Sequence, residues 1–270
     1  MSEFIKEAIV KYRPRKFLLL FSGGHDSLCS TYYAATFLKS IGADFTIYHG
    51  NTGIGIRQTR EYVYRTCSQF GWNIYEGHAG NTYETLVTKY GFPGPQSHRF
   101  MYIMLKERPL RKFITHTCKS SPYARENVLL ITGIRRTESK IRMGYKKYMT
   151  KDKSAIWLAP IFYWTENESE QYMERNRLPR NPVKDKICIS GECLCGAFAG
   201  HEEWIEIKTS YPEAAEEIER LHKIATGNGM PWGWASSPTQ YYKHNPRGQI
   251  NMFMCVGCES KNLQNIDPTS

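Results

Sequence analysis

Six residues near the N-terminus, Ser22-Gly23-Gly24-His25-Asp26-Ser27, have types and spacing suited to holding an anion. They follow the apolar run 17–21, expected to form a buried strand, and precede an apolar helix expected over 28–39. Glycines at such a turn let backbone N–H groups and a helix N-terminus point at phosphate or sulfate. The alternative is an ordinary glycine turn with Asp26 or Ser27 as helix cap. The loop matches neither a Walker A loop nor the Gly-x-Gly-x-x-Gly dinucleotide fingerprint.

The second chemical signal is a group of cysteines. The chain has eight, and five crowd into its last third: Cys188, Cys193, Cys195, Cys255 and Cys258. In a cytosolic chain, such clustering favours metal ligation over disulfides. A tetrahedral zinc site or a cubane cluster needs four thiolates, so which four of the five bind is left open. A [4Fe-4S] cluster would suit sulfur chemistry, and Zn²⁺ would instead fix the last third to the core.

The composition is that of a globular, basic protein. Its 270 residues are 41% hydrophobic, enough for one large domain or for one domain with a smaller appendage. Lys and Arg number 36 against 26 Asp and Glu, and the net charge of +10 favours polyanionic partners, although it also fits a merely soluble basic protein. The apolar runs are too short to cross a bilayer and no signal segment is visible, so we expect a cytoplasmic protein without a membrane partner.

Strands and helices are expected to alternate over the first two thirds of the chain. Further strands are expected at 44–49, 72–75, 128–132 and 156–158, and helices at 3–12, 57–70 and 81–119, the last broken at 91–95. The alternation predicts a parallel sheet. A capping box at 165–168 opens another helix that ends before Pro179, and a helical stretch at 202–224 is divided by Pro212. We predict two parts, 1–180 and 181–270.

Five segments resemble known motifs, and they occur in the expected order. Residues 22–27 look like the SGGxDS loop of PP-loop ATP pyrophosphatases. The other four resemble segments of the phosphoadenosine-phosphosulfate reductase family: its TG loop and following helix at 50–53 and 58–61, "LK-x-x-PL" at 105–110, "GIRR-x-ES" at 132–139 and "PI-x-x-W" at 160–165. The similarity covers about residues 15–196, and five ordered motifs are far more specific than one glycine-rich loop.

This resemblance implies an adenine-nucleotide alpha-hydrolase-like fold. A doubly wound, mostly parallel α/β sheet would carry the nucleotide at its strand C-termini, with a cysteine-rich, metal-binding C-terminal extension. The residues implied to bind ATP with Mg²⁺ are Phe21, Ser22, Gly23, Gly24, His25, Asp26, Ser27, Thr52, Gly53 and Gly133. Asp26 would hold the metal or cap the helix, and Arg135 and Arg136 would reach the anionic end, so these three are the catalytic candidates. His25 occupies a variable position of the motif and receives no catalytic role.

The chain also departs from the reductases of the iron–sulfur kind. They carry an adjacent Cys-Cys pair before the "LK-x-x-PL" segment, where this chain has 99–102 without cysteine, and they use a cysteine in a Glu-Cys-Gly-Leu-His tail as nucleophile. That tail has no counterpart here, since Cys258-Glu259-Ser260 does not reproduce it. A cluster would therefore recruit Cys188 and one or both of Cys255 and Cys258 beside Cys193 and Cys195.

Three stretches concentrate positive charge: 106–119, 142–153 and 175–186. Basic residues interleaved with tyrosines suit phosphate contacts and base stacking, and solvated helix faces are the alternative. The candidates for nucleic-acid contact are Lys106, Arg111, Arg142, Lys146 and Lys147.

Taken together, these features predict an ATP pyrophosphatase that adenylates nucleic acid in a sulfur-insertion pathway. The character is nearest to the ATP pyrophosphatases of DNA phosphorothioation, of the DndC and SspD type, with DNA favoured over RNA and a cysteine desulfurase as a candidate sulfur donor. A tRNA thiolase is a close relative of this hypothesis. Two alternatives stay open: a sulfonucleotide reductase, and a non-catalytic nucleotide-gated nucleic-acid-binding subunit with structural zinc.

Overall fold

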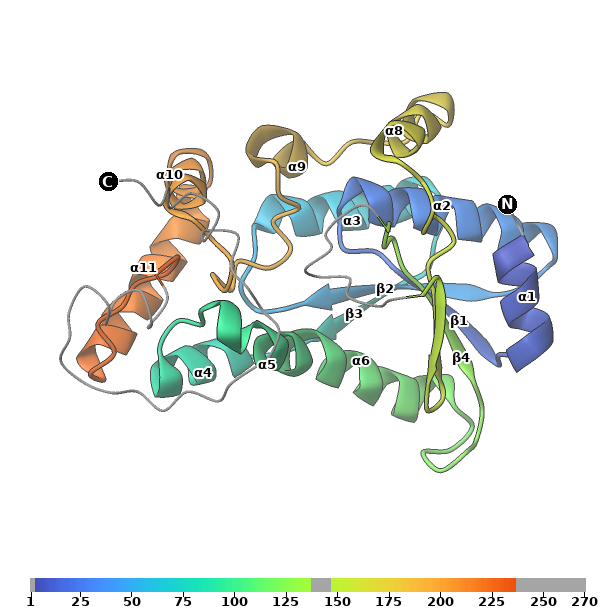
Figure 1. Ribbon diagram of the computed structural model, residues 1–270, viewed down its shortest axis with the longest axis horizontal. Helices are drawn as coiled ribbons and strands as arrows, with labels where there is room; N and C mark the ends of the chain where they lie inside the picture. The colour runs from blue at the N-terminus through green and yellow to red at the C-terminus, as the bar shows by residue number, and fades with distance from the viewer. Residues whose placement is uncertain (1–2, 137–146, 237–270) are drawn as a thin grey trace, which may run out of the picture.

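The computed structural model describes residues 3–136 and 147–236, and this part of the chain is built on a six-stranded sheet (Figure 1). The strands are β1 (Lys16–Leu20), β2 (Phe45–Asn51), β3 (Ile74–His78), β4 (Val128–Ile131), β5 (Met149–Asp152) and β6 (Ala155–Leu158). Their order across the sheet is β3-β2-β1-β4-β6-β5, and all neighbours are parallel except β5 and β6. The predicted α/β fold with a mostly parallel sheet is confirmed.

The antiparallel strand β5 was not predicted from the sequence. Its residues, Met-Thr-Lys-Asp, are mostly polar and partly exposed, and they fall inside a stretch interpreted as a basic surface segment. A strand at the edge of a sheet needs only one neighbour and tolerates charged side chains, so its sequence carries little apolar signal.

Helices cover both faces of the sheet (Figure 1). One face carries α2 (His25–Ser40), α3 (Arg57–Gln69), α8 (Glu166–Arg175) and α9 (Pro182–Ile187), with α1 (Glu3–Tyr12) at the end of the molecule near the N-terminus. The other face carries α4 (Thr82–Tyr90), α5 (His98–Tyr102) and α6 (Arg108–Phe113), which two π-helical turns, η2 (Ile103–Glu107) and η3 (Ile114–Cys118), join and extend. A 3-10 turn, η1 (Pro95–Ser97), precedes α5.

Burial on both faces explains why the central strands are continuous apolar runs. In β1, Leu19 packs in a core with α2 and α3, whereas Leu18 packs in a second core with Phe113 of α6. Successive residues of a strand point to opposite faces, so a strand covered on both sides needs apolar residues at every position.

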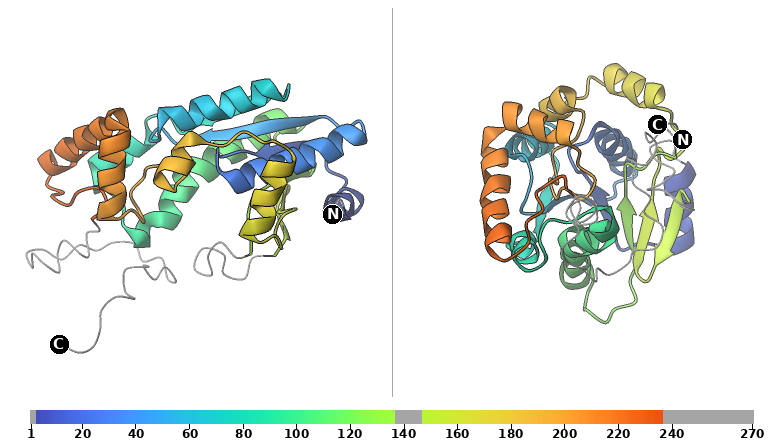
Figure 2. Two further views of the ribbon diagram at one scale, coloured as in Figure 1. Left: turned by 90° about the horizontal axis from the view of Figure 1, so that it is seen from above. Right: turned by 60° about the vertical axis from the view of Figure 1, so that its left-hand side comes forward.

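A further hydrophobic cluster joins residues from both predicted parts of the chain. Ile54 and Tyr83 share it with Val183, Leu194 and Leu221. Helix α11 (Pro212–Gly227) packs against α4, and α10 (His201–Ser210) packs against α11 and α9 (Figures 1 and 2). The division at residue 180 stays a prediction, and the described residues on its two sides are packed together.

Local signals located most helix boundaries. The capping box is present, with the Thr165 hydroxyl accepting from the Glu168 N–H and the Glu168 carboxylate accepting from the Thr165 N–H. Pro212 begins α11, as predicted. Helix α2 begins three residues earlier than predicted, at His25, and α9 was missed. Within 3–136 and 147–236, no helix has the length and apolar character that crossing a membrane requires.

Candidate nucleotide and thiol site

The loop between β1 and α2 has the geometry of an anion-binding turn. Gly23 has φ +84°, and a Cβ built on it would lie 2.7 Å from Thr59 Cγ2 of α3. Gly24 is the N-cap of α2 and supplies no side-chain cap. The first N–H groups of a helix have no acceptor inside the helix, so those of His25, Asp26 and Ser27 are available to an anion. Glycine is thus required at position 23, whereas the contacts around Gly24 leave room for a Cβ.

Two serines frame the inside of this loop. The Ser22 hydroxyl donates to Ser27 Oγ at 3.2 Å, and the Ser27 hydroxyl donates to the Gly24 carbonyl at 2.7 Å. A Cβ on Gly24 would lie 3.7 to 3.8 Å from the two hydroxyl oxygens. Neither Asp26 nor Ser27 caps the helix, so the cap interpretation is wrong.

The segment after β4 packs directly against the start of α2. A Cβ on Gly133 would lie 2.5 Å from both Cα and N of Ser27, atoms that cannot move without shifting the helix. Ser30 donates to the Thr132 carbonyl at 2.8 Å. Gly133 is therefore required for close packing, and it brings the following residues to the phosphate loop.

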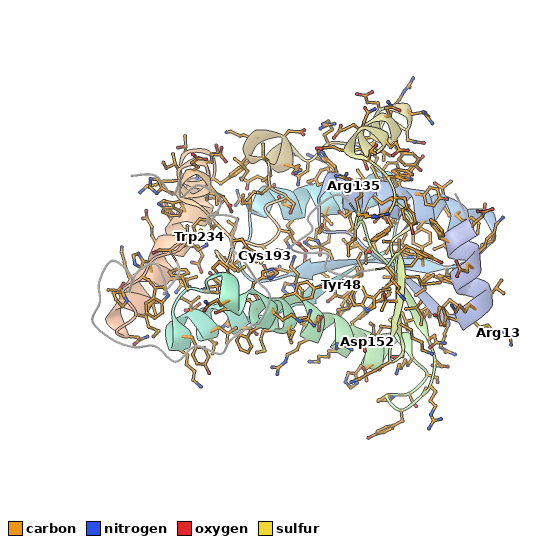
Figure 3. All side chains as sticks on the ribbon, in the orientation of Figure 1. Arg13, Tyr48, Arg135, Asp152, Cys193 and Trp234 are labelled. Atoms are coloured by element: carbon orange, nitrogen blue, oxygen red, sulfur yellow. The ribbon has the colours of Figure 1, made fainter. Side chains whose placement is uncertain are left out.

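Arg135 and Asp26 form an ion pair at this junction. Arg135 Nε lies 2.8 Å from Asp26 Oδ1, and both side chains are largely buried, with 9% and 19% exposure. Figure 3 places Arg135 beside α2, consistent with this contact. Arg136 is exposed, and its N–H donates to the Phe162 carbonyl at 2.7 Å. Of the three predicted catalytic residues, Asp26 and Arg135 are in contact, whereas Arg136 lies at the surface.

Phe21 contributes its backbone to the site and its side chain to the core. The ring is 1% exposed and packs edge-on against Tyr62. The Phe21 N–H donates to the Tyr48 carbonyl, and the Phe21 carbonyl lies 2.9 Å from Nδ1 of the buried His49. These contacts fix the entry of the phosphate loop.

The loop after β2, whose Thr52 and Gly53 are predicted to take part in nucleotide binding, is held by its own polar residues. The buried Thr52 hydroxyl donates to the Ile54 carbonyl at 2.9 Å. Gly53 has φ +77°, and its N–H donates to Asn51 Oδ1 at 2.9 Å. A cavity of about 360 Å³ lies beside this loop, between it and the α10–α11 junction, and residues 22–27 are not among those that line it.

Glu76 of β3 supports Asn51 and was not singled out from the sequence. Its carboxylate accepts from Asn51 Nδ2 at 3.0 Å and pairs with Arg60 at 2.7 Å. Burial opposes ionisation of Glu76, but the hydrogen bonds from Arg60, Asn51 and Tyr64 outweigh it and lower the pKa of this carboxyl. An ionised Glu76 therefore fixes Asn51, which in turn fixes Gly53.

His25 lies in a charged cluster formed with residues of α8 and α9. Its Nδ1 lies 3.7 Å from Glu170 of α8 and its Nε2 lies 3.6 Å from Asp185 of α9. Arg180 joins the same two carboxylates, at 2.6 Å and 3.1 Å. Burial, aided by Arg180, lowers the pKa of His25 against the opposing effect of the carboxylates. The cluster attaches α8 and α9 to the start of α2.

Cys193 and Cys195 form a hydrogen-bonded pair next to the loop after β2. A hydrogen bond from the Cys195 thiol lowers the pKa of Cys193 to about 6, against the effect of burial, and the Lys106 ammonium acts in the same direction. That same bond, together with burial, raises the pKa of Cys195 well above its usual value. This hydrogen bond therefore favours the thiolate at Cys193 and the thiol at Cys195.

The predicted metal centre is partly within the described residues. Four thiolates are needed for a zinc site or a cubane cluster, and Cys193 and Cys195 supply two. Cys188 is exposed, and residues 3–136 and 147–236 contain no group of three or more His, Cys, Asp or Glu residues that could hold a metal. Cys255 and Cys258 lie outside the described residues. The thiols that are described are therefore an incomplete ligand set, and we derive no chemical step through a metal.

The predicted nucleic-acid contacts fall in different surroundings. Lys106 Nζ lies 2.6 Å from Glu192 Oε2, and the nearby Glu192 and Cys193 raise the pKa of this lysine despite its burial. Arg111 pairs with Asp152 of β5 at 2.6 Å, and Lys147 is exposed. Arg142 and Lys146 lie outside the described residues. The Lys106 ammonium thus faces the cysteine segment.

Comparison with known proteins identifies the family. The model of the phosphoadenosine phosphosulfate reductase domain matches residues 16–261, so the chain belongs to this family. It is 28% identical over 247 residues to the uncharacterized protein MJ0066 of Methanocaldococcus jannaschii. That alignment covers 89% of this chain and 48% of the relative, so the chain spans about half the length of the curated protein it matches.

Three solved structures are similar at TM-scores of 0.48. One is a phosphoadenylyl-sulfate reductase from Candida auris in a phosphate complex, with 16% identity over 68% of this chain and 83% of that one. The U34-tRNA thiolase NcsA from Methanococcus maripaludis, with its [4Fe-4S] cluster, has 17% identity over 95% and 84%. The NH3-dependent NAD synthetase from Campylobacter jejuni has 15% identity over 84% and 92%.

Proposed function

We propose that this protein binds ATP at the phosphate loop and transfers the adenylyl group to an oxygen of a nucleic acid, as one step of sulfur insertion. The observation that carries the proposal is that one short segment, Ser190–Cys195, connects the phosphate loop to the cysteine pair. Ser190 lies beside Gly24 of the loop, next to the helix start that carries the Arg135–Asp26 ion pair, and the segment ends with Cys193 and Cys195. The net charge of +10 supports a polyanionic acceptor.

In this proposal, an oxygen of the acceptor, such as a backbone phosphate oxygen, attacks the α-phosphorus of ATP. The bond from that phosphorus to the oxygen bridging the α- and β-phosphates breaks, and pyrophosphate leaves with the electron pair. The N–H groups at the start of α2 would hold the polyphosphate, and Arg135, which is ion-paired with Asp26 at this helix start, would offset charge on the leaving group. Mg²⁺ bound with the nucleotide would neutralise phosphate charge, with Asp26 as its carboxylate ligand.

The adenylated oxygen is then displaced by sulfur. A persulfide sulfur from a donor protein, such as a cysteine desulfurase, would attack the acceptor phosphorus, and AMP would leave with the oxygen. A thiol would then release the donor by reducing the remaining sulfur–sulfur bond. We propose DNA as the acceptor in preference to RNA, as in DNA phosphorothioation.

Pyrophosphate release tests this function. Purified protein is incubated with Mg-ATP alone, with duplex DNA and with tRNA, each with and without a cysteine desulfurase. The proposal predicts pyrophosphate formation that DNA stimulates and that the variant Asp26→Ala loses. Absence of pyrophosphate under every condition would contradict it, and stimulation by tRNA alone would reassign the acceptor.

A second candidate, sulfonucleotide reduction, is favoured by the family itself and by the Cys193 thiolate. In that reaction a thiolate attacks the sulfur of adenylyl sulfate, and sulfite is finally released at the expense of a reducing thiol. Incubation with adenylyl sulfate and a thioredoxin-like donor discriminates the two functions, because only the reductase would release sulfite.

Metal analysis tests the remaining alternative, in which the protein is a nucleotide-gated nucleic-acid-binding subunit with structural zinc. Anaerobic purification with iron, acid-labile sulfide and zinc determination is the experiment. About four irons and four sulfides per chain would support active sulfur chemistry. One zinc in a colourless protein that binds ATP without turnover would support the binding subunit.

A further inference from the structure

Asn181 lies far from the phosphate loop in sequence, but its side chain hydrogen-bonds the loop, a segment beside the loop and the start of α9. It is 0% exposed and is the N-cap of α9, which packs beside α3 (Figure 1). Its Nδ2 donates to the Gly23 carbonyl at 2.9 Å and to the Ser190 carbonyl at 3.3 Å, and its Oδ1 accepts from the Val183 N–H at 3.0 Å. An amide has two N–H donors and one carbonyl, so this one side chain meets all three partners.

The bond to the Gly23 carbonyl determines how one peptide unit of the loop is turned. The described peptide bonds are all trans, and a trans unit directs its C=O and its N–H to opposite sides. Since Asn181 holds the Gly23 carbonyl on its own side, the N–H of Gly24 must point the other way. Gly24 is the N-cap of α2, so this N–H extends the row of donors at the helix start.

The other bond of the amide fixes a neighbour of the loop. The Ser190 carbonyl accepts from Asn181 and also from Thr59 Oγ1 of α3, at 2.5 Å. Ser190 Cβ lies 3.9 Å from the position that a Cβ on Gly24 would occupy. Asn181 therefore links the loop, α3 and the segment that leads to Cys193.

We infer that Asn181 is a positioning residue of the phosphate site, which turns the Gly23–Gly24 peptide so that its N–H faces the bound polyphosphate. The inference deepens the proposed function and rests on it, because it presumes that the loop binds the phosphates of ATP. The Gly23 peptide could rotate without this amide, since glycine at φ +84° has no side chain to restrain it.

Two variants remove the donor and keep a helix cap. Asn181→Ser retains a capping oxygen and adds no charge, but its short side chain cannot reach the Gly23 carbonyl. Asn181→Asp retains the cap and places an oxygen opposite the two carbonyls. The matched control is Asn127→Asp, which removes an equivalent amide bond to the Tyr12 carbonyl, 2.7 Å long, away from the site. Affinities for Mg-ATP and for inorganic tripolyphosphate are measured by calorimetry, together with thermal unfolding.

The inference predicts that both Asn181 variants, while folded at the assay temperature, bind ATP and tripolyphosphate about tenfold to a hundredfold more weakly, with Asn127→Asp unchanged. Wild-type affinity in folded Asn181→Ser would overturn it. So would equal losses in the control, or failure of both Asn181 variants to fold, since the residue would then serve the fold in general. If the wild-type protein binds neither ligand, the proposed nucleotide site fails first, and that result is distinct from wild-type binding that Asn181→Ser leaves unchanged.

Discussion

The phosphate loop and the cysteine segment lie at the same part of the molecule, yet they are constructed differently. The loop, residues 22–27, is a single contiguous turn. Its Gly23 is required by the close contact with Thr59, and Gly133, which follows β4, is required by its close contact with Ser27. The cysteine segment, residues 188–195, depends on partners from elsewhere, above all Lys106 and Thr52. The loop is therefore formed by residues adjacent in sequence, whereas the surroundings of the cysteines are formed by residues that only the fold brings together.

This difference determines where each region is vulnerable. A Cβ on Gly133 would meet backbone atoms of Ser27, which cannot move without shifting α2. The cysteine pair depends on side-chain charges and hydrogen bonds, which a substitution changes by degrees. We therefore expect abrupt losses from changes at the loop and graded effects at the cysteines.

The largest effect is expected from Gly133→Val. Its Cβ would lie 2.5 Å from backbone atoms of Ser27, so α2 must move, and we expect ATP binding to fall below detection. Stability should fall by about 1–3 kcal/mol, as is typical of overpacking. The control is Gly227→Ala, which meets nothing within 4 Å. Calorimetry and denaturant unfolding check the prediction, and a Gly133→Val protein with wild-type ATP affinity would show that the junction is not rigid.

The Arg135–Asp26 pair should follow next. Removing one partner of a buried pair costs about 3–5 kcal/mol, and we expect less for Arg135→Met because Asp26 is 19% exposed. The double variant with Asp26→Asn should be less destabilised than the sum of the single variants. Urea unfolding of all four proteins gives the coupling.

An exposed ion pair provides the matched control for this double-mutant cycle. Lys208 and Glu219 lie 2.9 Å apart with side-chain exposures of 62% and 44%, so their coupling should not exceed about 1 kcal/mol. Equal coupling in the two cycles would mean that burial gives the Arg135–Asp26 pair no special strength.

At the cysteine segment we expect a shift in pH dependence. In metal-free protein, alkylation of Cys193 by iodoacetamide should rise with pH to a midpoint near 6, since the thiolate is the reactive form and is present above its pKa. Cys195→Ala removes the main cause of the lowered pKa, and Lys106→Met a lesser one, so both should move the midpoint upward. Site-resolved mass spectrometry follows the reaction. A midpoint that stays near 6 in both variants would contradict the assigned causes.

The smallest effect is expected at the N-terminal cap of α8, which lies outside both regions in sequence. Thr165→Ala removes the cap of α8 and should cost about 1 kcal/mol of stability while leaving ATP affinity unchanged. Thermal unfolding and calorimetry test this. A change in ATP affinity would indicate that α8 transmits strain to His25 through Glu170.

Contiguity also explains what the sequence could predict. The phosphate loop and the central strands follow from neighbouring residues, because glycine spacing and continuous apolar runs are local signals. Asn181 has no such signal, since it acts on Gly23 across 158 positions of sequence. For Lys106 the sequence points to the wrong environment, because a lysine in a basic stretch suggests a solvated charge. Only the fold brings Glu192 next to it. The edge strand β5 could not be predicted either, because its polar residues give no apolar strand signal.

Adenylyl transfer to DNA is tested most directly by following the phosphates of ATP. The protein is incubated with DNA and ATP labelled at either the α- or the γ-phosphate, without a sulfur donor, so that any adenylated intermediate accumulates. Adenylyl transfer at the loop predicts label on the DNA from the α-phosphate only, with pyrophosphate released in equal amount. Label from the γ-phosphate, or formation of ADP and inorganic phosphate, would contradict adenylyl transfer at the loop.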